Sequence, residues 1–228
     1  MRILLLAFFL LSGILTLNAQ CPDGYLIDEN YTISSEDVYY ASNTNALGDT
    51  IDLFMTIYTP NNDTFSERPL VIFAFGGAFV SGDRNDPIMT SLCEQFARKG
   101  YVAATIDYRL FPSAVLGSPD SLELVDASIK AIGDMKGAIR FFRQSAEEGN
   151  PYKVNPDYIV VGGFSAGAFT ALHTTYLDEN DELPAGFDSL VIANGGLEGS
   201  TGDAINQTYS SEVQACIAFA GSSSFSSR

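Results

Sequence analysis

A serine lies in a G-x-S-x-G frame at residues 163–167, within the stretch VVGGFSAGAFTALH. A free serine hydroxyl is a weak nucleophile, so it must be presented to the substrate and activated by a base. Glycines two positions to either side of Ser165 permit a sharp strand-to-helix turn that projects such a hydroxyl. The helix expected to follow has a partial positive charge at its N-terminus, which favours a developing oxyanion. Ser165 is therefore the candidate nucleophile for acyl transfer.

A second glycine-containing stretch, FGGAF at residues 75–79, has the properties of an oxyanion hole. Acyl transfer needs backbone N–H groups directed at the carbonyl oxygen as it becomes negatively charged. Small residues are needed there because the substrate carbonyl must approach the backbone closely. We expect the donors to be the N–H groups of Gly77 and Ala78, together with that of Ala166, directly after the nucleophile.

Buried strands alternating with helices are expected to position both stretches. Apolar runs at 70–75, 101–109, 157–163 and 213–221 predict buried strands, and extended segments at 32–45 and 50–60 precede them. Helical patterns cover residues 86–100, 120–148 and 165–177. This alternation predicts an α/β fold with a mostly parallel sheet and helices on both faces. Ligands bind such sheets beyond the carboxyl ends of the strands, where FGGAF and Ser165 both fall.

Four stretches resemble, in order and spacing, the serine esterases of the α/β-hydrolase fold: LVIFAFGGAFVSGD, GYVAATIDYRL, GDMKGAIRFFRQSA and IVVGGFSAGA. The likeness covers about residues 50 to 220 and is strongest to the carboxylesterase and hormone-sensitive-lipase-like branch, which includes secreted bacterial enzymes. It implies that Ser165 is the nucleophile and that Gly77 and Ala78 match the second and third glycines of the HGGG turn. Ala166 matches the other oxyanion donor.

Two residues depart from the pattern of that family. Phe75 stands where many relatives carry His, and Ala78 where most carry Gly. Neither departure removes a backbone donor, so neither rules out activity. Residues 107–109 match a recurring Asp-Tyr-Arg after the fourth strand, which we interpret as structural.

The base and the acid that the resemblance implies follow the serine in chain order. The single histidine, His173, is eight positions beyond Ser165 in the same predicted helix. It is therefore ~12 Å away along the axis, whereas a base must come within ~3 Å of its proton. We predict that His173 is a packed helix residue. Four carboxylates are acid candidates in name only: Asp178, Asp188, Glu198 and Asp203.

We accordingly interpret the sequence as a C-terminally truncated hydrolase that lacks the last strands and both partners of Ser165. Residues 1–19 combine one basic residue, an apolar run and small residues at the end, which predicts a signal peptide. A membrane anchor and a lipoprotein modified at Cys21 are the alternatives. Residues 20–228 would form the hydrolase domain of a secreted or periplasmic protein without stable membrane insertion.

Three cysteines, at positions 21, 93 and 216, occur in the chain. A Cys21–Cys93 disulfide tying down the N-terminus is our preferred pairing. Buried free thiols are the alternative for Cys93 and for Cys216, which lies in a strand expected to be buried. No Cys or His cluster has the spacing of metal ligands, and we expect neither a metal nor a cofactor.

The chain is strongly acidic, with a formal net charge of −16 at pH 7. Such a surface repels phosphate backbones, so nucleic acid is an unsuitable partner. The expected substrate is a small-molecule or polysaccharide-linked carboxylic ester, cleaved through an acyl-enzyme on Ser165. Two alternatives stay open: a catalytically inactive secreted binding protein with the same fold, and an exopeptidase.

Overall fold

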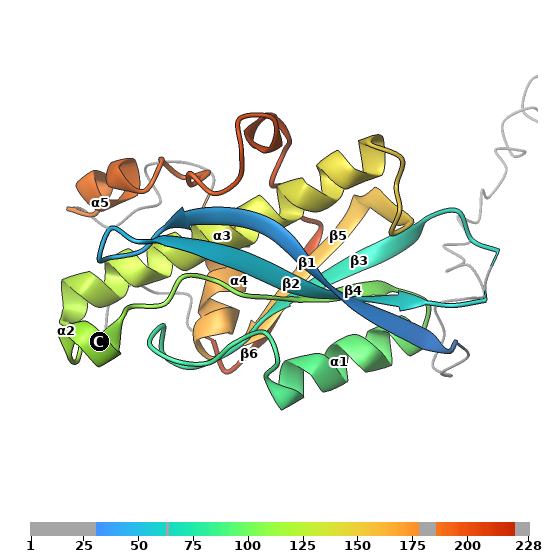
Figure 1. Ribbon diagram of the computed structural model, residues 1–228, viewed down its shortest axis with the longest axis horizontal. Helices are drawn as coiled ribbons and strands as arrows, with labels where there is room; N and C mark the ends of the chain where they lie inside the picture. The colour runs from blue at the N-terminus through green and yellow to red at the C-terminus, as the bar shows by residue number, and fades with distance from the viewer. Residues whose placement is uncertain (1–30, 63, 178–185, 222–228) are drawn as a thin grey trace, which may run out of the picture.

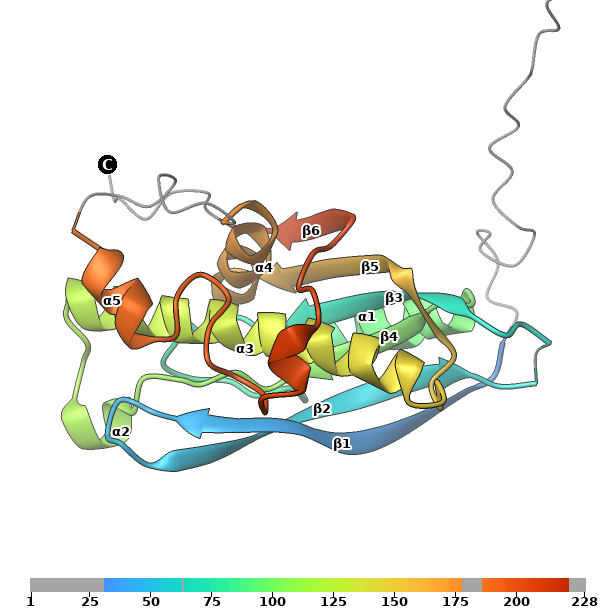
Figure 2. The same cartoon turned by 90° about the horizontal axis from the view of Figure 1, so that it is seen from above.

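The computed structural model describes residues 31–62, 64–177 and 186–221. The predicted signal peptide therefore lies outside the described residues. Six strands form one sheet: β1 (Ile33–Thr44), β2 (Thr50–Pro60), β3 (Arg68–Ala74), β4 (Val102–Ile106), β5 (Val154–Phe164) and β6 (Ala215–Phe219). Their order across the sheet is β1-β2-β4-β3-β5-β6, with β1 and β6 at opposite edges in Figure 2. Strand β2 pairs antiparallel with β1 and β4, and the other four strands run parallel, as predicted.

Helices cover both faces of this sheet, which confirms the predicted α/β architecture. The elements are α1 (Pro87–Arg98), α2 (Ser113–Leu116), α3 (Ser121–Glu147), α4 (Ala166–Tyr176), α5 (Asp188–Ala193) and the 3-10 helix η2 (Asn206–Thr208). Figure 1 shows α3 above the sheet and α1 below it. Helix α4 packs on β5 and β6 and also against α3. None of the helices within the described ranges has the length and apolar character needed to span a bilayer.

Local signals explain where the long helices begin. Asp86 accepts hydrogen bonds from the N–H groups of Ile88 and Met89, and a proline opens α1. Asp120 and Glu123 form a capping box at the start of α3, which satisfies two N–H groups reciprocally. The predicted helix over residues 120–148 therefore matches α3 closely. Helices α2, α5 and η2 were not predicted.

The central strands are buried and the last strand is not. Every residue of β4 is buried, and β3 is buried from Leu70 to Ala74, as their apolar runs predicted. The run at residues 213–221 does contain a strand, β6, as predicted, but the prediction that it is buried is wrong. Strand β6 pairs with β5 and is the last in the sheet order of the described residues, so Ala215 and Phe219 are exposed.

The two described cysteines do not form a disulfide. Cys93 lies on the buried face of α1, and Cys216 is half-buried on β6; both are free thiols. The predicted Cys21–Cys93 disulfide is therefore wrong, because Cys93 is a free thiol that fills part of the apolar core as a small hydrophobic residue. Cys21 lies outside the described residues. Burial raises the pKa of the Cys93 and Cys216 thiols, which keeps them protonated and unreactive.

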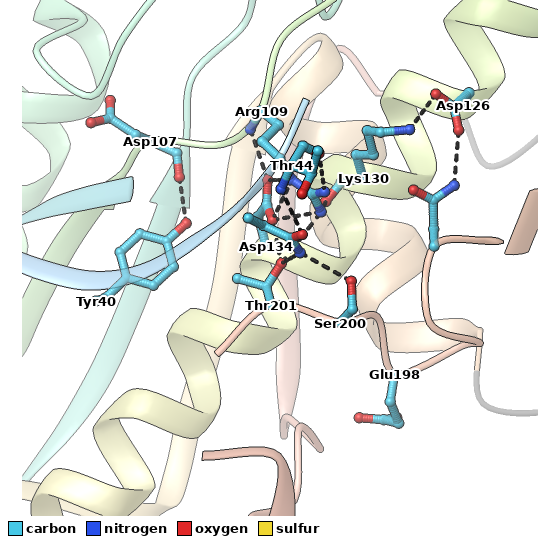
Figure 3. Close-up of polar contacts among 12 residues, drawn as sticks. Tyr40, Thr44, Asp107, Arg109, Asp126, Lys130, Asp134, Glu198, Ser200 and Thr201 are labelled. Carbon is cyan, nitrogen blue, oxygen red and sulfur yellow. Dashed lines mark hydrogen bonds and ion pairs between the residues drawn. The ribbon is translucent and has the colours of Figure 1, made fainter. Parts of the chain in front are cut away.

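A buried polar cluster joins the end of β4 to α3 and to the glycine-rich segment after α5 (Figure 3). Arg109 pairs with Asp134 at 2.9 Å, and the two side chains are 3% and 0% exposed. The Arg109 N–H also donates to the Asp134 carboxylate, at 2.8 Å. Thr201 donates its hydroxyl to the same carboxylate at 2.5 Å. This hub, made of Arg109, Asp134 and Thr201, agrees with a structural role for the Asp-Tyr-Arg motif.

We predict that Asp134→Asn lowers the free energy of unfolding by about 3–5 kcal/mol, because it leaves the Arg109 charge buried without its counterion. The control is Lys130→Gln on the same helix, which breaks the more exposed pair with Asp126. It should cost less than about 1 kcal/mol. Urea unfolding of both variants measures the difference, and similar small losses would contradict a structural role for the hub.

Candidate active site

Ser165 occupies the junction between β5 and α4 in a strained backbone conformation. Its φ is 52° and its ψ is −114°, a region that residues with a side chain rarely adopt. The Ser165 N–H donates to the Phe219 carbonyl at 2.9 Å, and the Ser165 carbonyl accepts the Phe169 N–H at 3.0 Å. These hydrogen bonds fix Ser165 to the last residue of β6 and to the first turn of α4. The predicted strand-to-helix turn at the candidate nucleophile is confirmed.

The flanking glycines are required by a close approach between α4 and the end of β3. A Cβ atom on Gly167 would lie 2.1 Å from the Ala74 carbonyl oxygen. A Cβ atom on Gly163 would lie 2.4 Å from the carbonyl carbon of Gly167 and 2.6 Å from the Ala74 oxygen. Real side chains do not reach such distances. Glycine at both positions therefore allows α4 to begin directly beside the carboxyl end of β3.

The turn at residues 75–79, the oxyanion turn, follows β3 at the same edge of the sheet. Ala74 is in register with Gly163 across the β3–β5 pair. A Cβ atom on Gly76 would lie only 3.3 Å from the Ser165 Cβ, so this turn lies directly against the candidate nucleophile. The structure thus brings together the two stretches that the sequence placed at strand ends.

Three successive residues of the oxyanion turn have a positive φ. The values are 132° at Gly77, 53° at Ala78 and 62° at Phe79. The Gly77 carbonyl accepts the N–H groups of Val80, at 3.0 Å, and Ser81, at 3.2 Å. A non-glycine residue in this region costs conformational energy, so Ala78 and Phe79 must be held by their surroundings.

The predicted oxyanion donors belong to these two elements. Ala166 is the first residue of α4, where an N–H group lacks an acceptor within its own helix. The dipole of α4 adds partial positive charge at this point. None of the hydrogen bonds found among the described residues uses the N–H groups of Gly77 or Ala78. Their role as donors stays a prediction.

His173 is packed inside the fold, as predicted from its position in the helix. Its side chain is buried, and its Nδ1–H donates to the Phe169 carbonyl at 2.8 Å. The imidazole also stacks on the Phe169 ring, with centroids 3.8 Å apart. Burial lowers the pKa of His173, partly opposed by the hydrogen bond to the Phe169 carbonyl. These contacts account for the histidine without a role as the base of Ser165.

Glu198, one of the nominal acids, takes part in a structural ion cluster. Its carboxylate accepts from Lys136 at 3.1 Å, from Arg140 at 3.1 Å and from the Ser211 hydroxyl at 2.7 Å. Burial acts to raise the pKa of Glu198, but the Ser211 hydrogen bond and the two cations lower it below its usual value. Both cations are almost fully buried in α3, so Glu198 ties the glycine-rich segment to that helix.

The other nominal acids are also accounted for or lie outside the described residues. Asp203 accepts from the N–H groups of Ile205 and Asn206, at 2.9 and 2.7 Å, and so caps the turn that leads into η2. Asp188 lies in the first turn of α5, where a carboxylate is favoured by the helix dipole. Asp178 lies outside the described residues. The described part of the chain therefore shows no carboxylate arranged to orient a histidine beside Ser165.

A pocket of about 440 Å³ opens at the same edge of the sheet, next to the oxyanion turn. The start of β2, the oxyanion turn with the residues after it, and the loop after β4 form its wall. Its apolar lining includes Leu53, Phe75, Val80, Tyr108 and Phe111, and Ser165 is not part of the lining. The sequence did not predict this pocket, because its wall combines segments that are far apart in the chain.

Comparison with known proteins gives one family and many similar structures. The family model described as BD-FAE matches residues 55–228. Esterase 2 of Thermogutta terrifontis phosphorylated by paraoxon is 28% identical, with a TM-score of 0.56 over 82% of this chain and 57% of that one. The native form, described as a novel thermophilic esterase, is 26% identical, with a TM-score of 0.54 over 82% and 53%. A search of curated proteins found no match.

The chain thus spans little more than half the length of these solved esterases.

We predict that Gly167→Ala destabilises the protein by about 3 kcal/mol or more, because the added methyl group collides with the backbone of β3. The control is Gly149→Ala, where φ is 110° and no atom lies within 4 Å of the added carbon. That change introduces only conformational strain of about 1–2 kcal/mol. Thermal unfolding followed by circular dichroism compares them, and equal losses would argue against the close approach.

Proposed function

Because the chain belongs to the BD-FAE family and has the predicted α/β-hydrolase fold, we propose that it hydrolyses carboxylic esters with Ser165 as its nucleophile. The observation that carries this proposal is the backbone of Ser165, with a φ of 52° and a ψ of −114° between β5 and α4. In this turn the Ser165 Cβ lies directly against the oxyanion turn, which supports presentation of the hydroxyl to a substrate carbonyl bound there. Such strain concentrates at functional sites, where the surrounding structure maintains it.

In the proposed reaction, the Ser165 Oγ attacks the ester carbonyl carbon while its proton passes to a base. The carbonyl oxygen becomes an oxyanion and accepts hydrogen bonds from the N–H groups of Gly77, Ala78 and Ala166. Collapse of this intermediate breaks the bond to the alcohol, which leaves with the proton from the base. Water then attacks the acyl-enzyme, which releases the carboxylic acid and restores the Ser165 hydroxyl.

We propose that the base is a histidine outside these 228 residues, oriented by an acid that is also outside them. The single histidine of the chain is buried, and its Nδ1 is engaged by the Phe169 carbonyl. A polypeptide of residues 20–228 should therefore react only slowly with a fluorophosphonate. Rapid labelling of that polypeptide, lost in Ser165→Ala, would contradict this part of the proposal.

The proposed substrate is a small-molecule or polysaccharide-linked carboxylic ester, bound without a cofactor. The pocket of about 440 Å³ beside the oxyanion turn is within the usual size range of small-molecule sites. Its largely apolar wall suits an acyl or alkoxy group. The formal net charge of −16 disfavours phosphate-bearing ligands and nucleic acid.

We also propose that the protein is exported, to the periplasm or the medium, by the signal peptide at residues 1–19. It would then belong with the secreted members of the carboxylesterase and hormone-sensitive-lipase-like branch. Mass spectrometry of the mature protein tests the export, and retention of residues 1–19 would contradict it.

In protein expressed from its complete reading frame, we predict that Ser165→Ala lowers ester hydrolysis at least about 10⁴-fold, because the nucleophile is lost. Ser91→Ala on the surface of α1 is the control and should stay within twofold of the unmodified protein. Hydrolysis of p-nitrophenyl esters and labelling by a fluorophosphonate measure the effect. A folded protein that neither hydrolyses esters nor labels would instead be a binding protein, and cleavage of peptides alone would identify an exopeptidase.

We predict that His173→Asn retains at least about a tenth of the esterase activity. Asparagine can still donate to the Phe169 carbonyl, so the hydrogen bond within the helix can be kept. Removal of a catalytic histidine would instead cost several orders of magnitude. Steady-state kinetics on p-nitrophenyl acetate distinguishes the two cases. A fall in kcat greater than about 1,000-fold, in a variant that folds normally, would identify His173 as the base.

A further inference from the structure

The strained oxyanion turn is held at its start by one side chain from the loop after β4. The Tyr108 hydroxyl donates to the Phe75 carbonyl at 2.9 Å. The two rings stack at a centroid distance of 4.2 Å and an interplanar angle of 17°. Phe75 is only 2% exposed and Tyr108 3% exposed, so water does not compete for this hydrogen bond.

The same tyrosine contacts the far end of the turn. The Phe79 ring packs edge-on against the Tyr108 ring, with centroids 6.2 Å apart. The Phe79 carbonyl accepts the N–H of Phe111 at 2.8 Å, from the loop that carries Tyr108. Phe79 also packs against Phe169 of α4 at 5.9 Å. Both ends of the strained segment therefore rest on the loop after β4.

We propose that Tyr108 is a positioning residue that fixes the oxyanion turn for ester hydrolysis, an inference that rests on the proposed function. The Phe75 carbonyl and the Gly76 N–H belong to one rigid peptide plane. Anchoring the carbonyl therefore orients the backbone that enters the turn, and the packed Phe79 ring fixes the backbone that leaves it. The N–H groups of Gly77 and Ala78 lie between these two anchors.

The chemistry of Tyr108 suits this task throughout the pH range of an esterase. Burial raises the pKa of Tyr108 well above its usual value, so the hydroxyl stays protonated and remains a donor. The Phe75 side chain has no polar group with which to hold the turn. The donor at this point is therefore supplied by Tyr108.

Tyr108→Phe keeps the ring that lines the pocket and removes only the hydroxyl bonded to the Phe75 carbonyl. The change should therefore affect the transition state more than substrate binding. Loss of a whole oxyanion donor typically lowers kcat by 10²–10³-fold. Tyr108→Phe keeps the donors but loosens them, so we expect kcat to fall about tenfold to a hundredfold. KM should stay within twofold, and the pH profile of kcat should be parallel to that of the unmodified protein.

Tyr40 on β1 provides a matched control, because it bonds to the residue next to Tyr108. Its hydroxyl donates to the Asp107 carbonyl at 2.6 Å, as Figure 3 shows, and its side chain is 5% exposed. Tyr40→Phe therefore removes the same atom and another hydrogen bond from a tyrosine hydroxyl to a backbone carbonyl, but leaves the oxyanion turn anchored. Both variants should lose a similar amount of stability, seen as a fall in Tm of about 2–4 °C.

The kinetic test compares these two variants on p-nitrophenyl acetate, in protein expressed from its complete reading frame. We expect kcat to fall at least tenfold in Tyr108→Phe and less than twofold in Tyr40→Phe. Equal kcat values in the two variants, at equal Tm, would overturn the proposal. A fall in kcat matched by an equal rise in KM would also overturn it, because that pattern indicates a substrate contact.

Hydrogen exchange provides a readout that does not depend on catalysis. The amides of Val80 and Ser81, which donate to the Gly77 carbonyl within the turn, should exchange at least about tenfold faster in Tyr108→Phe, and at the unmodified rate in Tyr40→Phe. Unchanged exchange in both variants would overturn the positioning role. If the unmodified protein hydrolyses no ester, the proposed function fails, while the exchange rates still decide whether Tyr108 holds the turn.

Discussion

The contact between the Gly167 backbone and the Ala74 carbonyl is the constraint on which the candidate site depends. A side-chain carbon at Gly167 would come within 2.1 Å of that oxygen, so α4 can begin beside β3 only with glycine there. Two residues before this contact, Ser165 has a φ of 52°, and its Cβ lies against Gly76. The strained turn at the candidate nucleophile and its closeness to the oxyanion turn therefore both occur where α4 approaches β3.

Polar groups buried behind that edge keep its loops in place. The Arg109–Asp134–Thr201 hub and the cluster around Glu198 fasten the loop after β4 and the glycine-rich segment to α3. Buried charges are costly unless paired, which makes these contacts selective for one arrangement of the loops. Tyr108, which lies in the loop after β4, holds the oxyanion turn through its hydrogen bond to the Phe75 carbonyl. Buried hydrogen bonds and ion pairs therefore hold the loops of the candidate site in place, in addition to the packing of the apolar core.

Local sequence patterns were sufficient for the features that depend on neighbours along the chain. They gave the strands, the three long helices and the turn at Ser165, because capping residues, apolar runs and flanking glycines act within a few residues. They failed where distant segments decide: the exposure of β6, the free thiol of Cys93 and the partners of Glu198. The hub illustrates the limit, since Arg109 meets Thr201 from 92 positions away and no local signal pairs them.

The hub also has a consequence for how the chain folds during synthesis. Asn43 on β1 donates to Thr201, which follows it by 158 residues. At ribosomal rates of 5–20 residues per second, about 8 to 30 s separate the emergence of these two partners. Asp134 precedes Thr201 by 67 residues, so for about the last 3 to 13 s of that interval Asp134 and Arg109 can pair without the threonine that completes the hub. The edge that carries the site is accordingly assembled late, and contacts of such long range make slow folding the expected behaviour.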